Sequence, residues 1–383
     1  MSTVARRSSA LALAFLLAAG AACSGDDRGA DAGPTTTAAA PAPGFDEIQI
    51  LASHNSYHVQ GPQPLLDAIT DALPALTPTI EYTHAPLTEQ LDRGVRSFEL
   101  DVFEDPDGGR YAAPKAIELL GLDPIDPAMT EPGFKVFHIQ EVDFRSTCPT
   151  LVRCLTELGT WSDAHPRHLP IVIHLEAKDG VIPDPLNLDF VQPLPATQGT
   201  FTALEAEIRS VLEDDQLVVP GDVQGGHDTL RAAIEDSGWP SVDDLRGRFL
   251  FVLDDHDAKR ALYRALHPDT RDRLIFVDAR PPEDDAAFTV LNDPVANQTT
   301  IEQLVAQGYL VRTRTDADTV EARAGDTTRR DAAFASGAQI VSTDFEAEDT
   351  RFPGFVVVLP GGGPARCNPV SAPPDCRDEA LAE

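Results

Sequence analysis

Two carboxylates lie two residues apart in a stretch that otherwise has the composition of a buried strand. The stretch Val95–Phe103 reads VRSFELDVF and carries Glu99 and Asp101. Residues i and i+2 of a strand point to the same face, so both acids project from one side. Like charges in a poorly solvated place repel each other strongly unless a positive group lies between them. A divalent cation would supply that charge, whereas an ion pair with an arginine such as Arg96 is the structural alternative.

Other polar side chains occur at the ends of further strand-like stretches. The candidates are His54, Asn55, His138, Glu176 and Lys178, together with Arg312 and Arg314 as groups that could bind substrate. The carboxyl ends of parallel strands meet on one face of a barrel, so we expect these side chains to converge. Carboxylate and amide oxygens favour Ca²⁺ or Mg²⁺ over zinc. Histidines beside such a cation could transfer protons.

Two more polar groups near strand ends are given a structural interpretation. His174 lies deep in its strand, and we expect it to be a hydrogen-bonded core or supporting residue. Asp254, Asp255 and His256 precede a helix-like stretch and are predicted to cap that helix.

The order of the elements predicts an α/β fold with a parallel barrel. The predicted strands are Ile48–Asn55, Val95–Phe103, Phe134–Gln140, Leu169–Lys178, Arg248–Asp255, Arg273–Ala279, Tyr309–Thr315 and Ala338–Phe345. Helix-like stretches separate most of them, which favours parallel strands joined by crossovers. We therefore predict a (β/α)8 TIM barrel as a single catalytic domain. A doubly wound open sheet is the alternative, although no G-x-G-x-x-G motif follows the first strand.

The charge of the chain limits its partners. The 383 residues contain 30 Lys and Arg against 62 Asp and Glu, a formal net charge of −32. Such a chain would meet nucleic-acid phosphates with like charge, so we expect no nucleic-acid partner. Anionic membranes would repel it as well unless a cation or a local basic patch intervenes. We expect a monomer.

The N-terminus has the pattern of an export signal. Arg6 and Arg7 precede an apolar run from Ala10 to Ala22 that is too short to span a bilayer and ends at Cys23. We predict a lipoprotein-type signal over residues 1–23 with lipid on Cys23; ordinary signal cleavage is the alternative. Residues 24–43 are predicted to be a flexible linker, residues 44–360 the barrel domain and residues 361–383 a C-terminal tail. The mature chain is therefore expected outside the cytoplasmic membrane, secreted or lipid-anchored, without a transmembrane helix.

The remaining cysteines agree with export. They form two pairs that are close in sequence, Cys148 with Cys154 and Cys367 with Cys376. In an oxidising compartment these two bridges are the simplest of the three connectivities that four cysteines allow. A zinc site is disfavoured, because neither spacing is C-x-x-C and no histidine pair accompanies them.

Four segments resemble a known enzyme family. They are SHNSYH at 53–58, QLDRGVRSFELDV at 90–102, FHIQ at 137–140 and PIVIHLEAK at 170–178. Together they are similar to the calcium-dependent phosphoinositide-specific phospholipases C, most of all to the bacterial secreted branch. A more distant similarity is to the glycerophosphodiester phosphodiesterases. The resemblance covers roughly Phe45 to Phe345 and is strongest in the first half.

The resemblance implies roles for individual residues. His54 and His138 resemble the two catalytic histidines. The calcium ligands would be Asn55, Glu99, Asp101 and Glu176, and Lys178 would lie near the substrate phosphate or inositol. One departure from the family is the Pro/Gly-rich insertion Glu104–Pro132, which separates Asp101 from His138.

The implied reaction is cleavage of phosphatidylinositol at a membrane surface into diacylglycerol and an inositol phosphate, first a cyclic one. His54 or a calcium-bound carboxylate would be the base, and His138 the acid. One alternative is a glycerophosphodiesterase or a phospholipase D on the same barrel; those enzymes usually carry Arg where this chain has Asn55. The other is an exported lipoprotein that binds a phosphate or a polyol without cleaving it.

Overall fold

The computed structural model describes residues 42–184 and 187–383. The predicted signal over residues 1–23, with its candidate lipidation site Cys23, lies outside the described residues. The predicted linker lies outside them too, apart from residues 42 and 43. Within the described ranges, no helix has both the length and the apolar character needed to cross a membrane.

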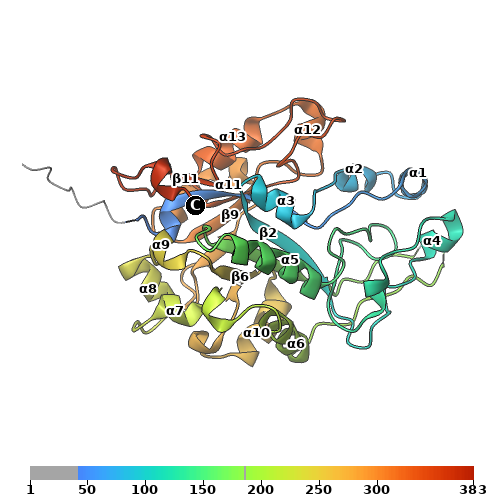
Figure 1. The fold of residues 1–383 in the computed structure, drawn as a ribbon, viewed down its shortest axis with the longest axis horizontal. Helices are drawn as coiled ribbons and strands as arrows, with labels where there is room; N and C mark the ends of the chain where they lie inside the picture. Colours follow the sequence, from blue (N-terminus) through green and yellow to red (C-terminus); the bar gives the residue numbers. More distant parts are fainter. Residues whose placement is uncertain (1–41, 185–186) are drawn as a thin grey trace, which may run out of the picture. The chain divides into compact units, whose positions relative to one another are not determined.

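Eight parallel strands form a curled sheet (Figure 1). In order around the sheet, the strands are β1 (Ile48–Ser53), β2 (Val95–Phe103), β4 (Ile171–Ala177), β6 (Phe249–Leu253), β7 (Phe276–Val277), β8 (Phe288–Val290), β9 (Leu310–Arg314) and β10 (Ile340–Thr343). Strand β10 pairs with β1, which closes the sheet into a barrel. Between β7 and β8 the pairing is one parallel bridge from Asp278 to Phe288, beside which the Ala279 N–H donates to the Phe288 carbonyl at 2.9 Å. A short strand, β5 (Leu217–Val218), also pairs with β6. The predicted α/β TIM-barrel class is confirmed.

One predicted strand is wrong and one barrel strand was not predicted. Within Phe134–Gln140, only β3 (Lys135–Val136) is extended, and it pairs antiparallel with the end of β2. The strand β8 was not predicted because it has three residues and follows the Pro- and Asp-rich segment 280–287. Three residues carry almost no periodicity, so neighbouring strands decide such pairing. The sequence therefore predicted eight strands, as many as the barrel has, but one of the eight, Phe134–Gln140, is not a barrel strand.

Helices cover the outside of the sheet (Figure 1). They are α3 (Leu87–Asp92), α5 (Leu151–Ala164), α6 (Gln198–Arg209), α7 (Pro220–Gln224), α8 (Leu230–Ser237), α9 (Val242–Leu245), α10 (Asp257–Leu266), α11 (Pro294–Val305), α12 (Val320–Ala324) and α13 (Thr328–Ala335). In α5, the side chain of Thr150 caps the first turn by accepting from the Arg153 N–H. The apolar positions Leu151, Leu155 and Leu158 are then buried on one side of that helix.

A second apolar cluster lies at the carboxyl ends of the strands. It joins Leu65, Leu66 and Ile69 of α1 (Gln63–Ala72) and Ile80 of α2 (Thr77–Ile80) to aromatic residues of the segment after β2. Figure 1 shows α1, α2 and α4 (Lys115–Leu120) grouped on one side of the barrel. Because Phe103, the last residue of β2, stacks on Phe137 within this cluster, the cluster begins where β2 ends. The insertion after β2 thus packs beside the end of the barrel where an active site is expected.

The C-terminal residues pack on the opposite end. Strand β11 (Ala365–Cys367) pairs antiparallel with the beginning of β1, at Ile48 to Ile50. The Glu383 carboxylate accepts a hydrogen bond from Arg96 Nε at 2.7 Å, so Arg96 pairs with the chain end and not with Glu99 or Asp101. The boundary at residue 360 stays a prediction.

The two predicted disulfides, Cys148–Cys154 and Cys367–Cys376, are confirmed.

Candidate active site

Three acids from two neighbouring strands converge at the carboxyl end of the barrel. Asp101 lies directly opposite Glu176 in the register of β2 and β4, and Glu99 lies two positions earlier, opposite His174. Carboxylate oxygens of Glu99, Asp101 and Glu176 lie within 4.8 Å of one another. Glu99 and Asp101 are buried, and Glu176 is partly exposed. The strand register thus brings these three predicted oxygen donors together.

Two basic side chains balance this acidic cluster. Arg312 of β9 forms ion pairs with Glu99 and, at 3.0 Å, with Asp254 after β6. Lys178 Nζ lies 3.0 Å from Asp101 and 3.2 Å from Glu176. Burial raises the pKa of Asp101 well above its ordinary value even beside Lys178. Burial acts in the same direction on Glu99, but the Arg312 guanidinium outweighs it and lowers the pKa of Glu99.

The donors present fit a hard cation such as calcium. Both oxygens of Asp101 are buried; Oδ2 lies 3.0 Å from Lys178 Nζ, whereas Oδ1 has no hydrogen-bond partner among the residues that the structure describes. Such oxygens are costly unless a positive group satisfies them. The carboxylate set of this cluster is the type that calcium binds.

Asn55 follows β1 on the same side of the barrel. Its backbone has a φ of 45°, in the left-handed region where asparagine is tolerated. Its Nδ2 donates to the Tyr82 hydroxyl at 2.9 Å, while its Oδ1 receives only a long bond of 3.4 Å from the Tyr57 hydroxyl. The next residue, Ser56, is hydrogen-bonded to the backbone of Glu99 in both directions, which ties this segment to β2.

His54 lies in a network with Asp344 and Arg314. The Nδ1 of His54 is 2.6 Å from Asp344 Oδ1, and Arg314 donates both to Asp344 Oδ2 at 2.8 Å and to His54 Nε2 at 3.2 Å. A carboxylate accepts and a guanidinium donates, so Nδ1 carries the proton and Nε2 is the acceptor. Burial, together with the positive charge of Arg314, lowers the pKa of His54 well below its ordinary value. His54 is therefore neutral, and its basic nitrogen, Nε2, faces the Arg314 guanidinium.

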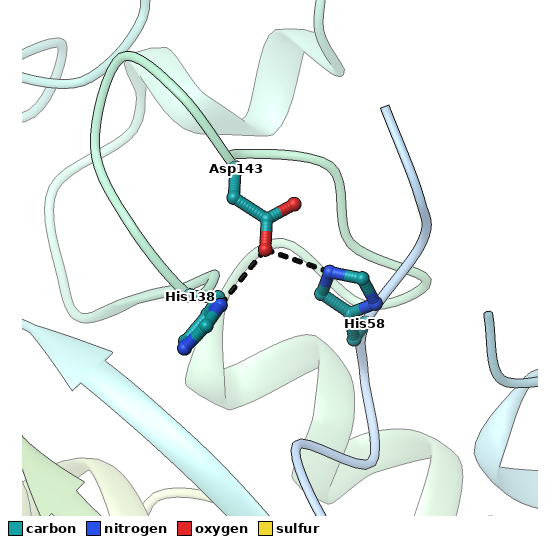
Figure 2. Close-up of side chains that lie close together, drawn as sticks. All are labelled: His58, His138 and Asp143. Atoms are coloured by element: carbon teal, nitrogen blue, oxygen red, sulfur yellow. Dashed lines mark hydrogen bonds and ion pairs between the residues drawn. The ribbon is translucent and has the colours of Figure 1, made fainter. Parts of the chain in front are cut away.

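His138 does not lie at the end of a barrel strand. It precedes a turn in which Ile139 and Asp143 form a backbone pair. Its Nδ1 lies 2.8 Å from Asp143 Oδ2, and Figure 2 shows that its other ring nitrogen points away from Asp143. The same oxygen of Asp143 lies 2.7 Å from His58 Nε2. Burial would raise the pKa of Asp143, but the two histidines outweigh it and hold the pKa below its ordinary value.

Several residues of this site were not selected from the sequence. Asp344 directly follows the last barrel strand, so its position carried a signal, and His58 lies within the SHNSYH segment. Asp143 acts from an irregular turn and had no periodic signal. The capping interpretation of Asp254 is wrong, since this residue pairs with Arg312, and Asp255 forms an ion pair with Lys259.

His256 and His174 were also predicted to have structural roles. The N-cap of α10 is His256, whose side chain makes no capping hydrogen bond within the part of the chain that the structure describes. His174 lies in the core, and its Nε2 is 3.0 Å from the Ser97 hydroxyl.

Solved structures with a similar fold include two of a Pseudomonas enzyme. Its calcium-dependent phosphoinositol-specific phospholipase C, in an apo form, is 18% identical, with a TM-score of 0.51 over 85% of this chain and 95% of that chain. A structure of the same enzyme described as a myo-inositol complex gives the same values. A Ca²⁺-dependent phosphatidylinositol-specific phospholipase C from Streptomyces antibioticus is 20% identical, with a TM-score of 0.49 over 79% of this chain and 95% of that chain. At these identities the Pseudomonas structures show a shared fold.

The family is shown by a comparison of sequence. No curated protein matches the chain. A family model described as phosphoinositide phospholipase C, Ca²⁺-dependent, matches residues 44–369, which is most of the chain. The chain therefore belongs to the Ca²⁺-dependent phosphoinositide phospholipase C family, whose members are phosphodiesterases.

Proposed function

We propose that this chain is an exported, calcium-dependent phosphodiesterase that cleaves phosphatidylinositol into diacylglycerol and an inositol phosphate, first a cyclic one. The observation that carries the proposal is the cluster of Glu99, Asp101 and Glu176, in which Asp101 Oδ1 is buried without a hydrogen-bond partner among the described residues. The same end of the barrel also carries His54 and His138. His54 is hydrogen-bonded to Asp344, and His138 to Asp143. Membership of the family supports the reaction class.

The proposed calcium ligands are Asn55, Glu99, Asp101 and Glu176. Bound calcium would lower the pKa of the attacking inositol hydroxyl and stabilise charge on the phosphoryl oxygens. Lys178 now pairs with two of these carboxylates. When a bound cation compensates the charge of these carboxylates, the Lys178 ammonium would be free to bind the substrate phosphate. We therefore propose Lys178 as a substrate-binding residue.

We assign proton donation to His138. Its Nδ1–H donates to Asp143, which leaves Nε2 to carry the proton that the diacylglycerol oxygen needs as it leaves. Asp143 holds the ring in this orientation and stabilises the protonated form. Such an acid contributes about 10²- to 10⁴-fold to the rate.

The base is proposed to be one of the calcium-binding carboxylates. His54 is a weak base, because its pKa is lowered and its acceptor nitrogen receives a hydrogen bond from Arg314. We therefore propose that His54 and Arg314 together contact the phosphate. Arg312 pairs with two acids, and we propose that it orients them behind the substrate.

The location and partners of the protein are part of the proposal. Two disulfides favour an oxidising compartment, which agrees with export through the signal over residues 1–23. The partner would be a phospholipid at a membrane surface, met by a monomer. The domain limits 44–360 and 361–383 are proposed with it.

The test is ³¹P product analysis on phosphatidylinositol in mixed micelles while calcium is titrated. We expect a cyclic inositol phosphate signal, loss of turnover in chelator, and recovery when calcium is returned. Full activity in chelator would contradict the calcium requirement. Release of choline or glycerol phosphate would favour a glycerophosphodiesterase or phospholipase D, and binding without cleavage of any diester would favour a binding protein.

A further inference from the structure

His58 is a fully buried histidine to which the proposed reaction gives no role. Its exposed fraction is 0%, and its ring stacks on Tyr82 with 4.2 Å between the ring centroids. Among the residues described, its Nδ1 has no hydrogen-bond partner, so the polar contact of this ring is that of Nε2 with Asp143 Oδ2 at 2.7 Å. Because a carboxylate only accepts hydrogen bonds, Nε2 of His58 carries a proton. Asp143 is therefore the hydrogen-bond partner of the His58 ring.

The oxygen that His58 contacts is the one that orients the proposed acid. Oδ2 of Asp143 is 2.7 Å from His58 and 2.8 Å from His138, and Figure 2 shows the carboxylate between the two rings. The other oxygen, Oδ1, is buried and accepts no hydrogen bond within residues 42–184 and 187–383. The two histidines are therefore what holds this carboxylate in its rotamer.

His58 also connects two segments that carry the two halves of the site. His138 and Asp143 belong to one turn, closed by bonds of 2.9 and 2.8 Å between the backbones of Ile139 and Asp143. His58 belongs to the segment after β1, where its N–H donates to the Asn55 carbonyl at 2.8 Å. The contact from His58 to Asp143 thus fixes the turn that carries the acid against the segment that carries a proposed calcium ligand.

We propose that His58 is a positioning residue for His138 and acts through Asp143. It holds Oδ2 where this oxygen accepts the Nδ1–H of His138, and so keeps Nε2 of His138 directed at the leaving oxygen. This inference rests on the proposed function. No proton passes through His58. Misplacing an acid by about 1 Å can cost about 10²-fold in rate.

The kinetic test uses two variants and two leaving groups. His58→Phe keeps an aromatic ring against Tyr82 but removes the donor, whereas His58→Gln keeps an N–H at the position of Nε2. The alkoxide leaving group of phosphatidylinositol needs a proton, whereas 4-nitrophenolate from an inositol 4-nitrophenyl phosphodiester does not. For His58→Phe we expect kcat on phosphatidylinositol to fall by about 10²-fold with KM unchanged, and kcat on the nitrophenyl diester to fall less than about threefold. His58→Gln should restore most of the lost rate.

A matched control separates positioning from folding. His168 is also fully buried and hydrogen-bonded, 2.7 Å from the Ser162 hydroxyl, but it precedes β4 at the other end of the barrel. We expect His168→Phe to lower stability and to leave the ratio of the two rates unchanged. An equal loss on both substrates for His58→Phe, or failure of His58→Gln to restore the rate, would overturn the inference.

A second readout does not depend on turnover. In ¹⁵N-edited NMR of the calcium-free protein, the Nδ1–H of His138 should be visible and protected from exchange in wild type, His58→Gln and His168→Phe, and absent in His58→Phe. An unchanged His138 signal in His58→Phe would overturn the inference. If the wild type cleaved neither diester, the proposed function would fail, whereas this NMR comparison would still decide the role of His58.

Discussion

Asp143 shows how much of the proposed chemistry depends on single buried groups. It is 1% exposed, and its charge is held by two imidazoles. Glu99 and Asp344 are held in the same way by Arg312 and Arg314. Ion pairs of this kind add little net stability, since desolvation opposes the Coulomb attraction. They fix the orientation of each ring or carboxylate instead.

Replacing Asp143 by Asn tests that orientation. The amide can still fill the space, but it no longer stabilises a protonated His138, so we expect kcat to fall by about 10²-fold or more with little change in KM. Steady-state kinetics on phosphatidylinositol micelles measures this. Asp126→Asn, which removes the carboxylate of a surface ion pair with Arg153, is the control and should behave as wild type. Wild-type kcat in Asp143→Asn would exclude His138 as the acid that Asp143 orients.

The sequence allowed part of this site to be anticipated. Strand parity was enough to predict that Glu99 and Asp101 share a face, and the strand register brings Glu176 opposite Asp101. Parity could not reveal Asp143 or His58, because both lie in irregular segments whose path is set by tertiary contacts. It also could not show that Arg312 pairs with Glu99 and Asp254, because these pairs join segments that are far apart in the sequence.

At the scale of elements, long strands were predicted well and short ones were not. The nine residues of β2 were predicted with the observed bounds, since an apolar stretch between turn residues is a strong signal. By contrast, β3 has two residues and β8 has three, and their pairing depends on what lies beside them. The helix-like stretch predicted after His256 is present as α10.

A prediction at this scale concerns the entry to β1. Burial raises the pKa of Asp46, just before that strand, from its ordinary 3.8 to about 6. The folded protein therefore binds this proton more tightly than the unfolded chain does. The associated stability is present below pH 3.8 and is lost as the pH rises through 6.

Asp46→Asn keeps an acceptor for the backbone N–H of Trp239 and removes the ionisation of residue 46. At pH 8 the variant should be more stable than wild type by about 1–3 kcal/mol, and the advantage should shrink toward zero near pH 4. Urea unfolding at a series of pH values measures the difference. If both proteins had the same pH dependence, Asp46 would not be the group responsible.

At the scale of the whole molecule, the two ends of the barrel have different tasks. The carboxyl end carries the acids and histidines beside the apolar cluster of α1 and α2. The amino end is covered by the last residues of the chain, where β11 pairs with β1 and Glu383 pairs with the buried Arg96. Stability and chemistry can therefore be altered separately.

Glu383→Ala tests that separation. It leaves the Arg96 guanidinium without its carboxylate, and we expect a loss of about 2–3 kcal/mol, below the range for a fully buried pair because Glu383 is partly exposed. The rate on phosphatidylinositol at a temperature where the variant is folded should be unchanged. Chemical denaturation and kinetics on the same sample measure both. A loss of rate without a loss of stability would contradict the division of tasks.

Calcium binding by the cluster of β2 and β4 is the claim on which the proposed function depends most. Isothermal titration of calcium into the wild type and into Asp101→Asn, with Asp126→Asn as a control of equal charge change, tests it directly. We predict one site in the wild type, the same affinity in Asp126→Asn, and affinity at least about tenfold weaker in Asp101→Asn. Calcium affinity in Asp101→Asn equal to that of the wild type would contradict the account.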